Sequence, residues 1–201
     1  MSGAEIDARI AQTLPRQPNT SYSRILREVA NRVMNTDDPE EIQLAILRGA
    51  ARIGDAAGLD LSPTVNRLLD DGRLSFQNPD GNILTTQFGY TDFSVAQPRV
   101  VISTKTTERF TNRFINGDAA QDLLHQMENM AAILAHEFEH VNHPELKANR
   151  AESEQQAWTE TVAAWKAIDA RGFAREIAVA EALLSISRTD VSKLPAYERL
   201  V

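Results

Sequence analysis

Residues 118–141 read DAAQDLLHQMENMAAILAHEFEHV, a long stretch in which apolar residues recur at helical spacing. The apolar positions that share one broad stripe on such a helix are Ala120, Leu123, Leu124, Met127, Ala131, Leu134, Phe138 and Val141. Asp118 followed by Gln121 resembles a capping box, and Pro144 disfavours helical geometry at His143. The sequence therefore predicts one long helix, from about residue 118 to about residue 143, with the stripe packed on the core.

The same stretch contains His136-Glu137-Phe138-Glu139-His140, an H-E-x-x-H motif. Residues i and i+4 of a helix lie about 5–6 Å apart on one face, so the two imidazoles can bind one ion. A zinc ion lowers the pKa of a bound water to about 7, and Glu137 can then take its proton as a general base. The motif therefore predicts a zinc-dependent hydrolase with Zn²⁺ as its cofactor.

The two histidines of the motif project from nearly the opposite side of this helix to Leu134, near Ala132 and Ile133. We expect one buried stripe and a separate histidine face in a helix that lies under an active-site cleft. The alternative is that both histidines are solvated residues on an amphipathic helix. His125 faces the same way but lies about 16 Å away along the axis, so we interpret it as an ordinary, partly exposed histidine.

A catalytic zinc site normally has a third protein ligand, and the sequence offers Glu152, Glu154 and His143. A second helix is predicted from residue 151 to about residue 170, and a short connection makes it an antiparallel neighbour of the first. On this helix Glu152 shares a face with Gln156, Thr159, Ala163 and Ala167, whereas Glu154 lies among Trp158, Val162 and Trp165. A polar face suits a cleft and an aromatic face suits a core. Glu152 is therefore the favoured ligand, with Glu154 and His143 as alternatives, and the two tryptophans are predicted to be core residues.

This arrangement resembles the zincin metallopeptidases, and among them the gluzincin type, in which a Glu on a following helix is the third ligand. In many such proteins the ligand is the first acid of a Glu-x-Glu pattern, with a polar residue four positions on. The matching positions here are Glu152, Glu154 and Gln156. The resemblance implies that the two motif histidines and Glu152 bind zinc and that Glu137 is the catalytic base. Two features depart from the pattern, since Gln156 stands where Asp is common and the interval between the motif and Glu152 is short.

The rest of the chain supplies shorter helices and a few strands. Helices are predicted at residues 22–34, 39–57, from 62 for a short distance, and 173–186. A turn at 78–82 is flanked by predicted strands at 74–77 and 83–88, and a third strand is predicted at 99–103. The sequence thus predicts an α+β fold: a mainly helical single domain at residues 21–201, with a small antiparallel sheet before the H-E-x-x-H helix. Residues 1–20 are predicted to form a flexible N-terminal arm.

Composition and charge narrow the classes of partner. The chain has 201 residues and a net charge of −7, and its Lys and Arg residues form no cluster in the sequence. A nucleic-acid or membrane partner is therefore disfavoured, which leaves a protein or peptide substrate as the expectation. The sequence contains no cysteine, no recognisable signal peptide and no long apolar run. We expect a cytoplasmic protein, or a toxin or effector exported by a non-classical route. Nothing in the sequence indicates an oligomeric state.

Several alternatives remain open at this stage. One is a structural site in which zinc pins the two helices together, and another is a catalytically silent, zincin-like module that binds a partner protein in the former substrate groove. For the strands, one interpretation is that they align an extended peptide, as the resemblance implies, and the other is that they only cover the apolar stripe of the long helix. The group that stabilises the oxyanion is not indicated, since Tyr90, Tyr197, His125 or an arginine could each do so.

Overall fold

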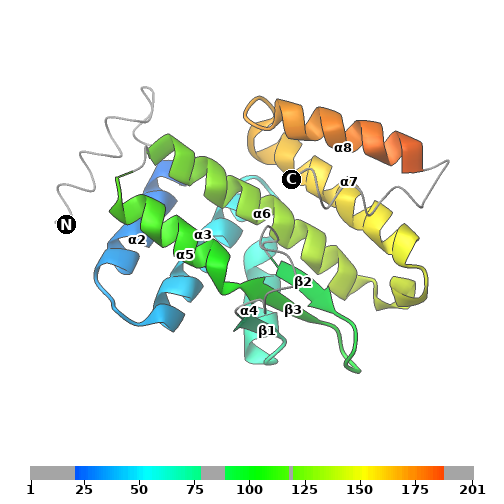
Figure 1. Cartoon of the computed structure of the whole chain (residues 1–201), viewed down its shortest axis with the longest axis horizontal. Helices are drawn as coiled ribbons and strands as arrows, with labels where there is room; N and C mark the ends of the chain where they lie inside the picture. The colour runs from blue at the N-terminus through cyan, green and yellow to red at the C-terminus, as the bar shows by residue number, and fades with distance from the viewer. Residues whose placement is uncertain (1–20, 78–88, 118–119, 188–201) are drawn as a thin grey trace.

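The computed structural model describes residues 21–77, 89–117 and 120–187. In this part of the chain the helices are α2 (Ser21–Met34), α3 (Pro39–Ala56), α4 (Leu61–Asp70), α5 (Thr104–Ile115), α6 (Ala120–Asn142), the 3-10 helix η1 (Pro144–Ala148), α7 (Arg150–Asp169) and α8 (Ala174–Ser187). The strands are β1 (Leu74–Gln77), β2 (Gly89–Asp92) and β3 (Arg99–Ser103). Figure 1 shows α6 crossing the middle of the molecule, with the other elements arranged around it. The predicted mainly helical fold with a small sheet is confirmed; the predicted arm, residues 1–20, lies outside the described residues.

Helices α2, α3 and α4 form the layer beneath α6. Asp38 caps α3 as predicted, because its side chain accepts a hydrogen bond from the backbone N–H of Glu40 at 2.9 Å and Pro39 occupies the first turn. Gly49 lets α3 approach closely, since a Cβ there would lie 2.3 Å from Val29 Cγ2 and 2.6 Å from Met127 Cε. A glycine on α3 therefore allows α2, α3 and α6 to meet in one apolar core.

The sheet differs from the predicted antiparallel arrangement. Its order is β1-β3-β2, and β1 pairs with β3 in parallel whereas β2 pairs with β3 antiparallel. The strands predicted at 74–77 and 99–103 are confirmed, the one predicted at 83–88 lies outside the described residues, and β2 was not predicted. The antiparallel prediction is wrong for β1, since β1 pairs in parallel with β3. Pairing between strands is a contact across the chain that local patterns do not specify.

Helix α5 follows β3 directly and was not predicted either. Its sequence begins with Thr104-Lys105-Thr106-Thr107, and β-branched residues weaken the helical signal. The buried side chains of α5 are nevertheless Thr107, Phe110 and Phe114, which recur at helical spacing. The two phenylalanines are therefore the signal from which this helix could have been identified.

Helix α7 runs back along α6 after the turn at η1, and α8 packs on the outer side of α7 (Figure 1). The long helix is confirmed, although the predicted capping residue Asp118 lies outside the described residues. The prediction that only one stripe of this helix is buried is wrong, because more of its surface is covered. Ala132 and the motif histidines, on the other side from Leu134, are also buried, because α7 covers that side.

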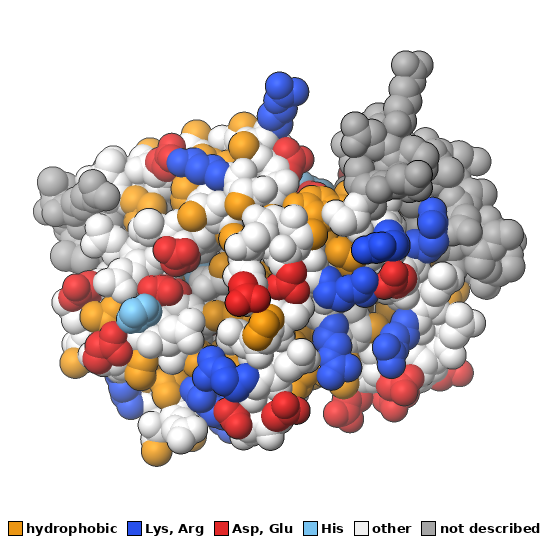
Figure 2. Space-filling view, turned by 180° about the vertical axis from the view of Figure 1, so that it is seen from behind, with side chains coloured by type: hydrophobic (Ala, Val, Ile, Leu, Met, Phe, Trp, Pro, Cys, Tyr) orange, Lys and Arg blue, Asp and Glu red, His pale blue; other side chains and the backbone are white. Residues whose placement is uncertain are grey.

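The surface seen from behind carries acidic and basic side chains next to one another (Figure 2). Lys and Arg gather toward the side where α2 and α3 lie, at the right of that view. Part of this charge is offset locally, since Glu28 pairs with Arg52 at 2.6 Å and with Arg24 at 4.0 Å. None of the helices in the described part of the chain is long and apolar enough to span a lipid bilayer.

Candidate metal centre

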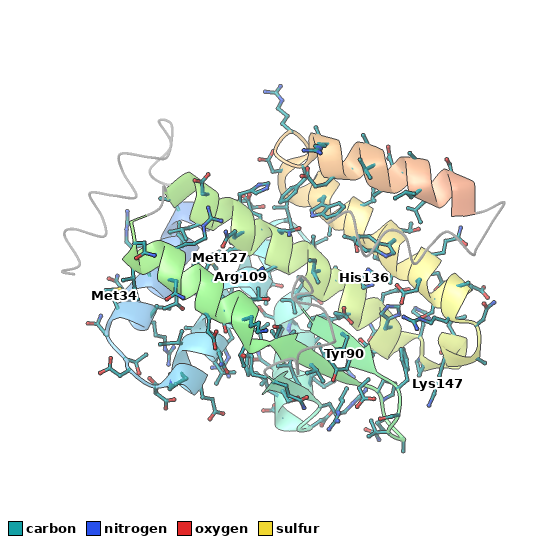
Figure 3. All side chains as sticks on the ribbon, viewed as in Figure 1. Met34, Tyr90, Arg109, Met127, His136 and Lys147 are labelled. Carbon is teal, nitrogen blue, oxygen red and sulfur yellow. The ribbon has the colours of Figure 1, made fainter. Side chains whose placement is uncertain are left out.

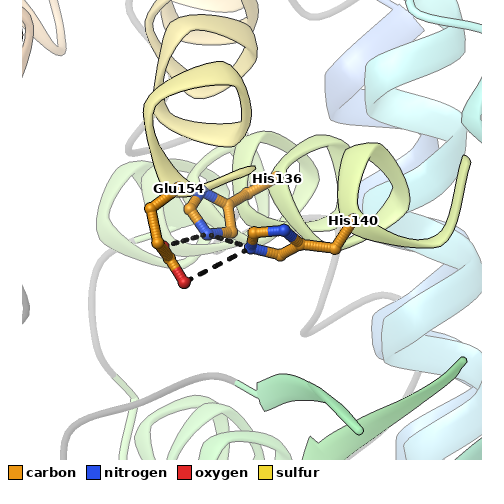
Figure 4. Close-up of side chains that lie close together, drawn as sticks. All are labelled: His136, His140 and Glu154. Atoms are coloured by element: carbon orange, nitrogen blue, oxygen red, sulfur yellow. Dashed lines mark hydrogen bonds and ion pairs between the residues drawn. The ribbon is translucent and has the colours of Figure 1, made fainter. Parts of the chain in front are cut away.

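The two motif histidines and a glutamate from the next helix come together at the interface of α6 and α7. His136 and His140 are one turn apart on α6, and their Nε2 atoms lie 3.3 Å from each other. Glu154 of α7 places Oε2 3.6 Å from His136 Nε2 and Oε1 3.7 Å from His140 Nε2 (Figure 4). One ligand atom of each residue lies within 4.8 Å of the others, so the three side chains form a group that can hold a metal ion.

A threonine on α7 determines which nitrogen of His136 is available to a metal. Thr161 donates its hydroxyl hydrogen to the carbonyl oxygen of Ala157 at 2.9 Å. Its oxygen lies 3.1 Å from His136 Nδ1, and with its hydrogen already used it must accept the hydrogen bond from that nitrogen. The proton of His136 is therefore on Nδ1. Its Nε2 lone pair points toward His140 and Glu154.

His140 has an equivalent partner in Ser153, whose Oγ lies 2.8 Å from His140 Nδ1. The pKa of His140 is lowered to about 4, chiefly by burial and also by the neighbouring His136, while Glu154 acts in the opposite direction. This imidazole is therefore neutral at neutral pH. A neutral imidazole is the form that binds a metal ion.

Glu154 is held in its ionised form even though it is partly buried. Burial raises the pKa of a carboxyl group, but the neighbouring polar groups of His136 and His140 and the charge of Arg150 together outweigh it, so the pKa of Glu154 is lowered. The closest approach of Arg150 to this carboxylate is 4.0 Å, from Nε to Oε1. The site thus combines a carboxylate with two imidazole nitrogens.

Glu137 lies next to this group but is held by the sheet. Its side chain is buried, and Thr91 of β2 lies with Oγ1 2.7 Å from Glu137 Oε2 and 3.2 Å from the Glu137 carbonyl oxygen. The threonine therefore fixes the carboxylate relative to β2. Glu137 lines the same cavity as the two motif histidines and Glu154.

The sequence favours Glu152 as the third ligand, but in the structure it is Glu154 that lies with the two histidines. Glu152 is exposed and closes a capping box with Asn149, which accepts from the Glu152 N–H at 3.4 Å and donates from Nδ2 to the Glu152 carboxylate at 2.8 Å. Glu152 is therefore a capping residue of α7, and Glu154 is brought to the histidines instead. The rule that an aromatic face belongs to the core holds only in part here, since Trp158 packs against the core but also lines the cavity. Trp158, on the Glu154 face, lines the cavity with its ring 4.8 Å from that of His136.

The other sequence candidates lie elsewhere or line the cavity wall. His143 pairs with Glu145 at 2.9 Å and with Glu139 at 3.3 Å, away from the metal ligands. His125 stacks on Phe173 with ring centroids 4.3 Å apart. Tyr90 lines the cavity, and Tyr197 lies outside the described residues. Trp165 is fully buried, as predicted for a core residue.

The centre opens into a cavity of about 970 Å³ that extends along α6 between β2, α5 and α7. Ser153 and Thr161 line it beside the ligands and were not identified from the sequence. They lie eight positions apart, so with Ala157 between them they form a buried stripe on one face of α7. Small or hydroxyl-bearing residues that recur every four positions, on a helix predicted to lie beside the histidine pair, are the sequence signal for Ser153 and Thr161.

Comparisons with known protein families, with curated proteins and with solved structures find no match to this chain. The geometry of the centre and the H-E-x-x-H motif are therefore the features from which a function can be inferred.

Proposed function

We propose that this protein is a zinc-dependent metallopeptidase in which His136, His140 and Glu154 bind the metal and Glu137 is the general base. The observation that carries the proposal is the arrangement of two imidazole nitrogens 3.3 Å apart, a carboxylate beside them and a buried Glu137 in the same cavity. A histidine pair with a glutamate is a ligand set of catalytic zinc sites, which keep the fourth position open.

The separations of the ligand atoms suit zinc. Ligands arranged tetrahedrally at zinc distances of about 2.0–2.2 Å lie about 3.3–3.6 Å from one another. The two imidazole nitrogens lie 3.3 Å apart, within that range, and Glu154 approaches them with different oxygens, Oε2 at 3.6 Å from His136 and Oε1 at 3.7 Å from His140. The hydrogen bonds between the far nitrogens of the histidines and the hydroxyl groups of Thr161 and Ser153 support the same conclusion, since such outer contacts orient ligand imidazoles.

The proposed reaction is the hydrolysis of a peptide bond. Zinc held by these residues supplies Lewis acidity, which polarises the carbonyl group and acidifies the water. Glu137 removes a proton from the attacking water as the new C–O bond forms, and returns it to the amine nitrogen as the C–N bond breaks. The contact with Thr91 keeps the Glu137 carboxylate oriented between strand and ligands. Arg150, on the cavity wall near Glu154, is the group we assign to the developing oxyanion.

Strand β2 offers a way to align the substrate. It is one of the two edge strands of the described sheet, and Gly89, Tyr90 and Thr91 line the cavity beside the proposed metal ligands. An extended peptide can pair with such an edge through main-chain hydrogen bonds, which hold it without requiring a particular sequence. This favours a peptide or protein substrate.

Two other functions compete with this proposal: a structural zinc site, and a catalytically silent module that binds a partner. A structural site is normally closed by four protein ligands, whereas the group found among the described residues has three. A buried carboxylate next to the ligands has no role in holding two helices together. Both features favour catalysis.

The test is the cleavage of an unfolded protein substrate by the zinc-loaded wild type, Glu137→Gln and Glu139→Gln. Glu139 is a matched control because it is a neighbouring acid on α6 that pairs with His143 instead of lining the cavity. We expect Glu137→Gln to keep its zinc and lose about 100-fold or more of the rate, while Glu139→Gln stays near wild type. Hydrolysis at the wild-type rate by Glu137→Gln would refute the proposed base.

A further inference from the structure

The cavity has the opposite charge balance to the chain as a whole. The chain carries 28 acidic and 21 basic residues. Among the described residues that line the cavity, the basic ones are Arg109, Arg113, Lys147 and Arg150, and the acidic ones are Glu137 and Glu154. Both acids already have roles at the metal centre. The remaining charged groups of the lining are therefore all positive.

The basic side chains lie at two ends of the cavity. Arg150 and Lys147 are near the metal ligands, where Arg150 approaches Glu154 and Lys147 donates to the carbonyl oxygen of Phe93. Arg109 and Arg113 are on α5, away from His136 along the helices (Figure 3). The two ends are thus separate sources of positive charge.

The α5 end is built as one continuous polar face. Arg109 and Arg113 are four residues apart on the helix, and Asn112 and Asn116 follow at the same helical spacing. Across from them, α6 contributes Gln126 and Asn129 to the lining. These amides are also cavity residues.

Both amides accept hydrogen bonds from neighbouring side chains. The carboxamide oxygen of Gln126, in the orientation that satisfies both groups, accepts from the Arg113 guanidinium. Asn129 Oδ1 accepts from Trp165 Nε1 at 3.0 Å, which fixes that amide against the core. Arginines and amides lining one pocket provide many hydrogen-bond donors together with positive charge. A guanidinium presents donors in a fork that matches a carboxylate.

We propose that Arg109 and Arg113 form an anion subsite that receives an acidic side chain of the bound peptide. The position of that side chain follows from helix geometry. Asn129 and Gln126 precede His136 by seven and ten residues, which is about 10–15 Å along α6, and an extended peptide advances about 3.3 Å per residue. The acidic residue therefore lies about three to five positions from the cleaved bond. This register rests on the proposed peptidase function, whereas the binding of a carboxylate by the arginines does not.

The binding of peptides is measured first, with the zinc-loaded Glu137→Gln variant as the protein. The probes are two fluorescein-labelled peptides of about twelve residues, one rich in Asp and Glu and the other with Asn and Gln at the same positions, and their binding is measured by fluorescence anisotropy.

 
We expect the acidic peptide to bind about 10-fold or more tightly than its amide counterpart. Arg109→Gln should remove most of that difference. Lys105→Gln is the matched control, since Lys105 is on the same helix but does not line the cavity, and it should leave the difference unchanged.

Equal affinity for the two peptides, or an equal loss in Lys105→Gln and Arg109→Gln, would overturn the subsite. Arg109 is exposed, so its replacement should leave the fold intact, and a thermal melt of each variant checks this. Arg109→Lys gives a second check, because it keeps the charge without the guanidinium fork and should bind the acidic peptide with intermediate affinity.

Cleavage separates this proposal from the peptidase proposal. Both peptides are incubated with zinc-loaded wild type, and the products are identified by mass spectrometry. Binding that depends on Arg109 without any cleavage supports the subsite and counts against the peptidase. Cleavage of both peptides at equal rates and affinities supports the peptidase and overturns the subsite. Faster cleavage of the acidic peptide, with the acid three to five positions from the cut, supports both.

Discussion

The two sides of α6 differ in what they bury. On the side toward α3, Met127 lies close to Gly49, and the fully buried neighbours Ala131 and Leu134 are apolar. On the side toward α7, the buried groups include two imidazoles, and each is hydrogen-bonded to a hydroxyl of that helix. Buried polar groups stabilise a fold only when they have partners, whereas apolar groups need only close packing. The comparison indicates that the first side provides stability and the second is arranged for chemistry.

The largest effect is expected on the apolar side. Leu134→Ala removes a fully buried side chain from the core, and a change of this kind lowers the free energy of unfolding by about 2–5 kcal/mol. Zinc content per folded chain should stay the same, because the ligands lie on the other side of the helix. Chemical denaturation and metal analysis of the folded fraction measure the two quantities. Loss of zinc from a chain that still folds would show that the two sides are not independent.

A smaller effect, which depends on pH, is expected at Glu128, also on α6. Burial raises the pKa of Glu128 to about 7, and Asp169 adds to this. Between pH values of about 4.5 and 7 the folded chain keeps a proton that the unfolded chain has lost, so this group lowers stability as pH rises through that range. Glu128→Gln should therefore raise the free energy of unfolding near pH 8 by on the order of 1–3 kcal/mol, and change it little near pH 4.

Urea denaturation at the two pH values measures this difference. Asp122→Asn is the control, since Asp122 is an exposed acid on the same helix. His140 changes stability in the opposite direction, because its pKa of about 4 lies below the ordinary value of 6.5 and stability is lost as pH falls between them. A Glu128→Gln variant with the same gain at both pH values would contradict the assigned pKa.

The next effect concerns the polar side. Thr161→Val keeps the shape of the side chain but removes the acceptor for His136 Nδ1, and we expect zinc affinity to fall by about 10–100-fold. Thr159→Val is the matched control, since Thr159 is exposed on the same helix and bonds to Gln155. Competition with a chromophoric chelator measures both affinities. Equal zinc affinity in the two variants would mean that Thr161 does not orient the ligand.

The difference between the two sides of α6 also explains what the sequence could and could not predict. The long helix is a local feature that the spacing of apolar residues predicts, and the H-E-x-x-H motif can be read directly from the sequence. The third ligand depends on how α7 is rotated about its axis, and that rotation was inferred from apolar residues. The stripe of α7 that packs on α6 includes Ser153 and Thr161. Because these are polar, the hydrophobic pattern did not identify the buried face, and Glu152 was preferred over Glu154.

The sheet was predicted only in part for a related reason. The strand patterns at β1 and β3 are local, but their parallel pairing joins segments that are far apart in the sequence. Helix α5 was missed because threonines dominate its first turn. The arginines of α5 line the cavity only because α5 packs beside α6. Their role could not be recognised before that packing was known.

The central claim is that Glu154, and not Glu152, completes the metal site with the two histidines of α6. The most direct test is zinc per chain, measured by elemental mass spectrometry after dialysis against a weak chelator, for the wild type, Glu154→Gln and Glu152→Gln. We expect about one zinc in the wild type and in Glu152→Gln, and little in Glu154→Gln. Zinc retained by Glu154→Gln but lost from Glu152→Gln would contradict the account.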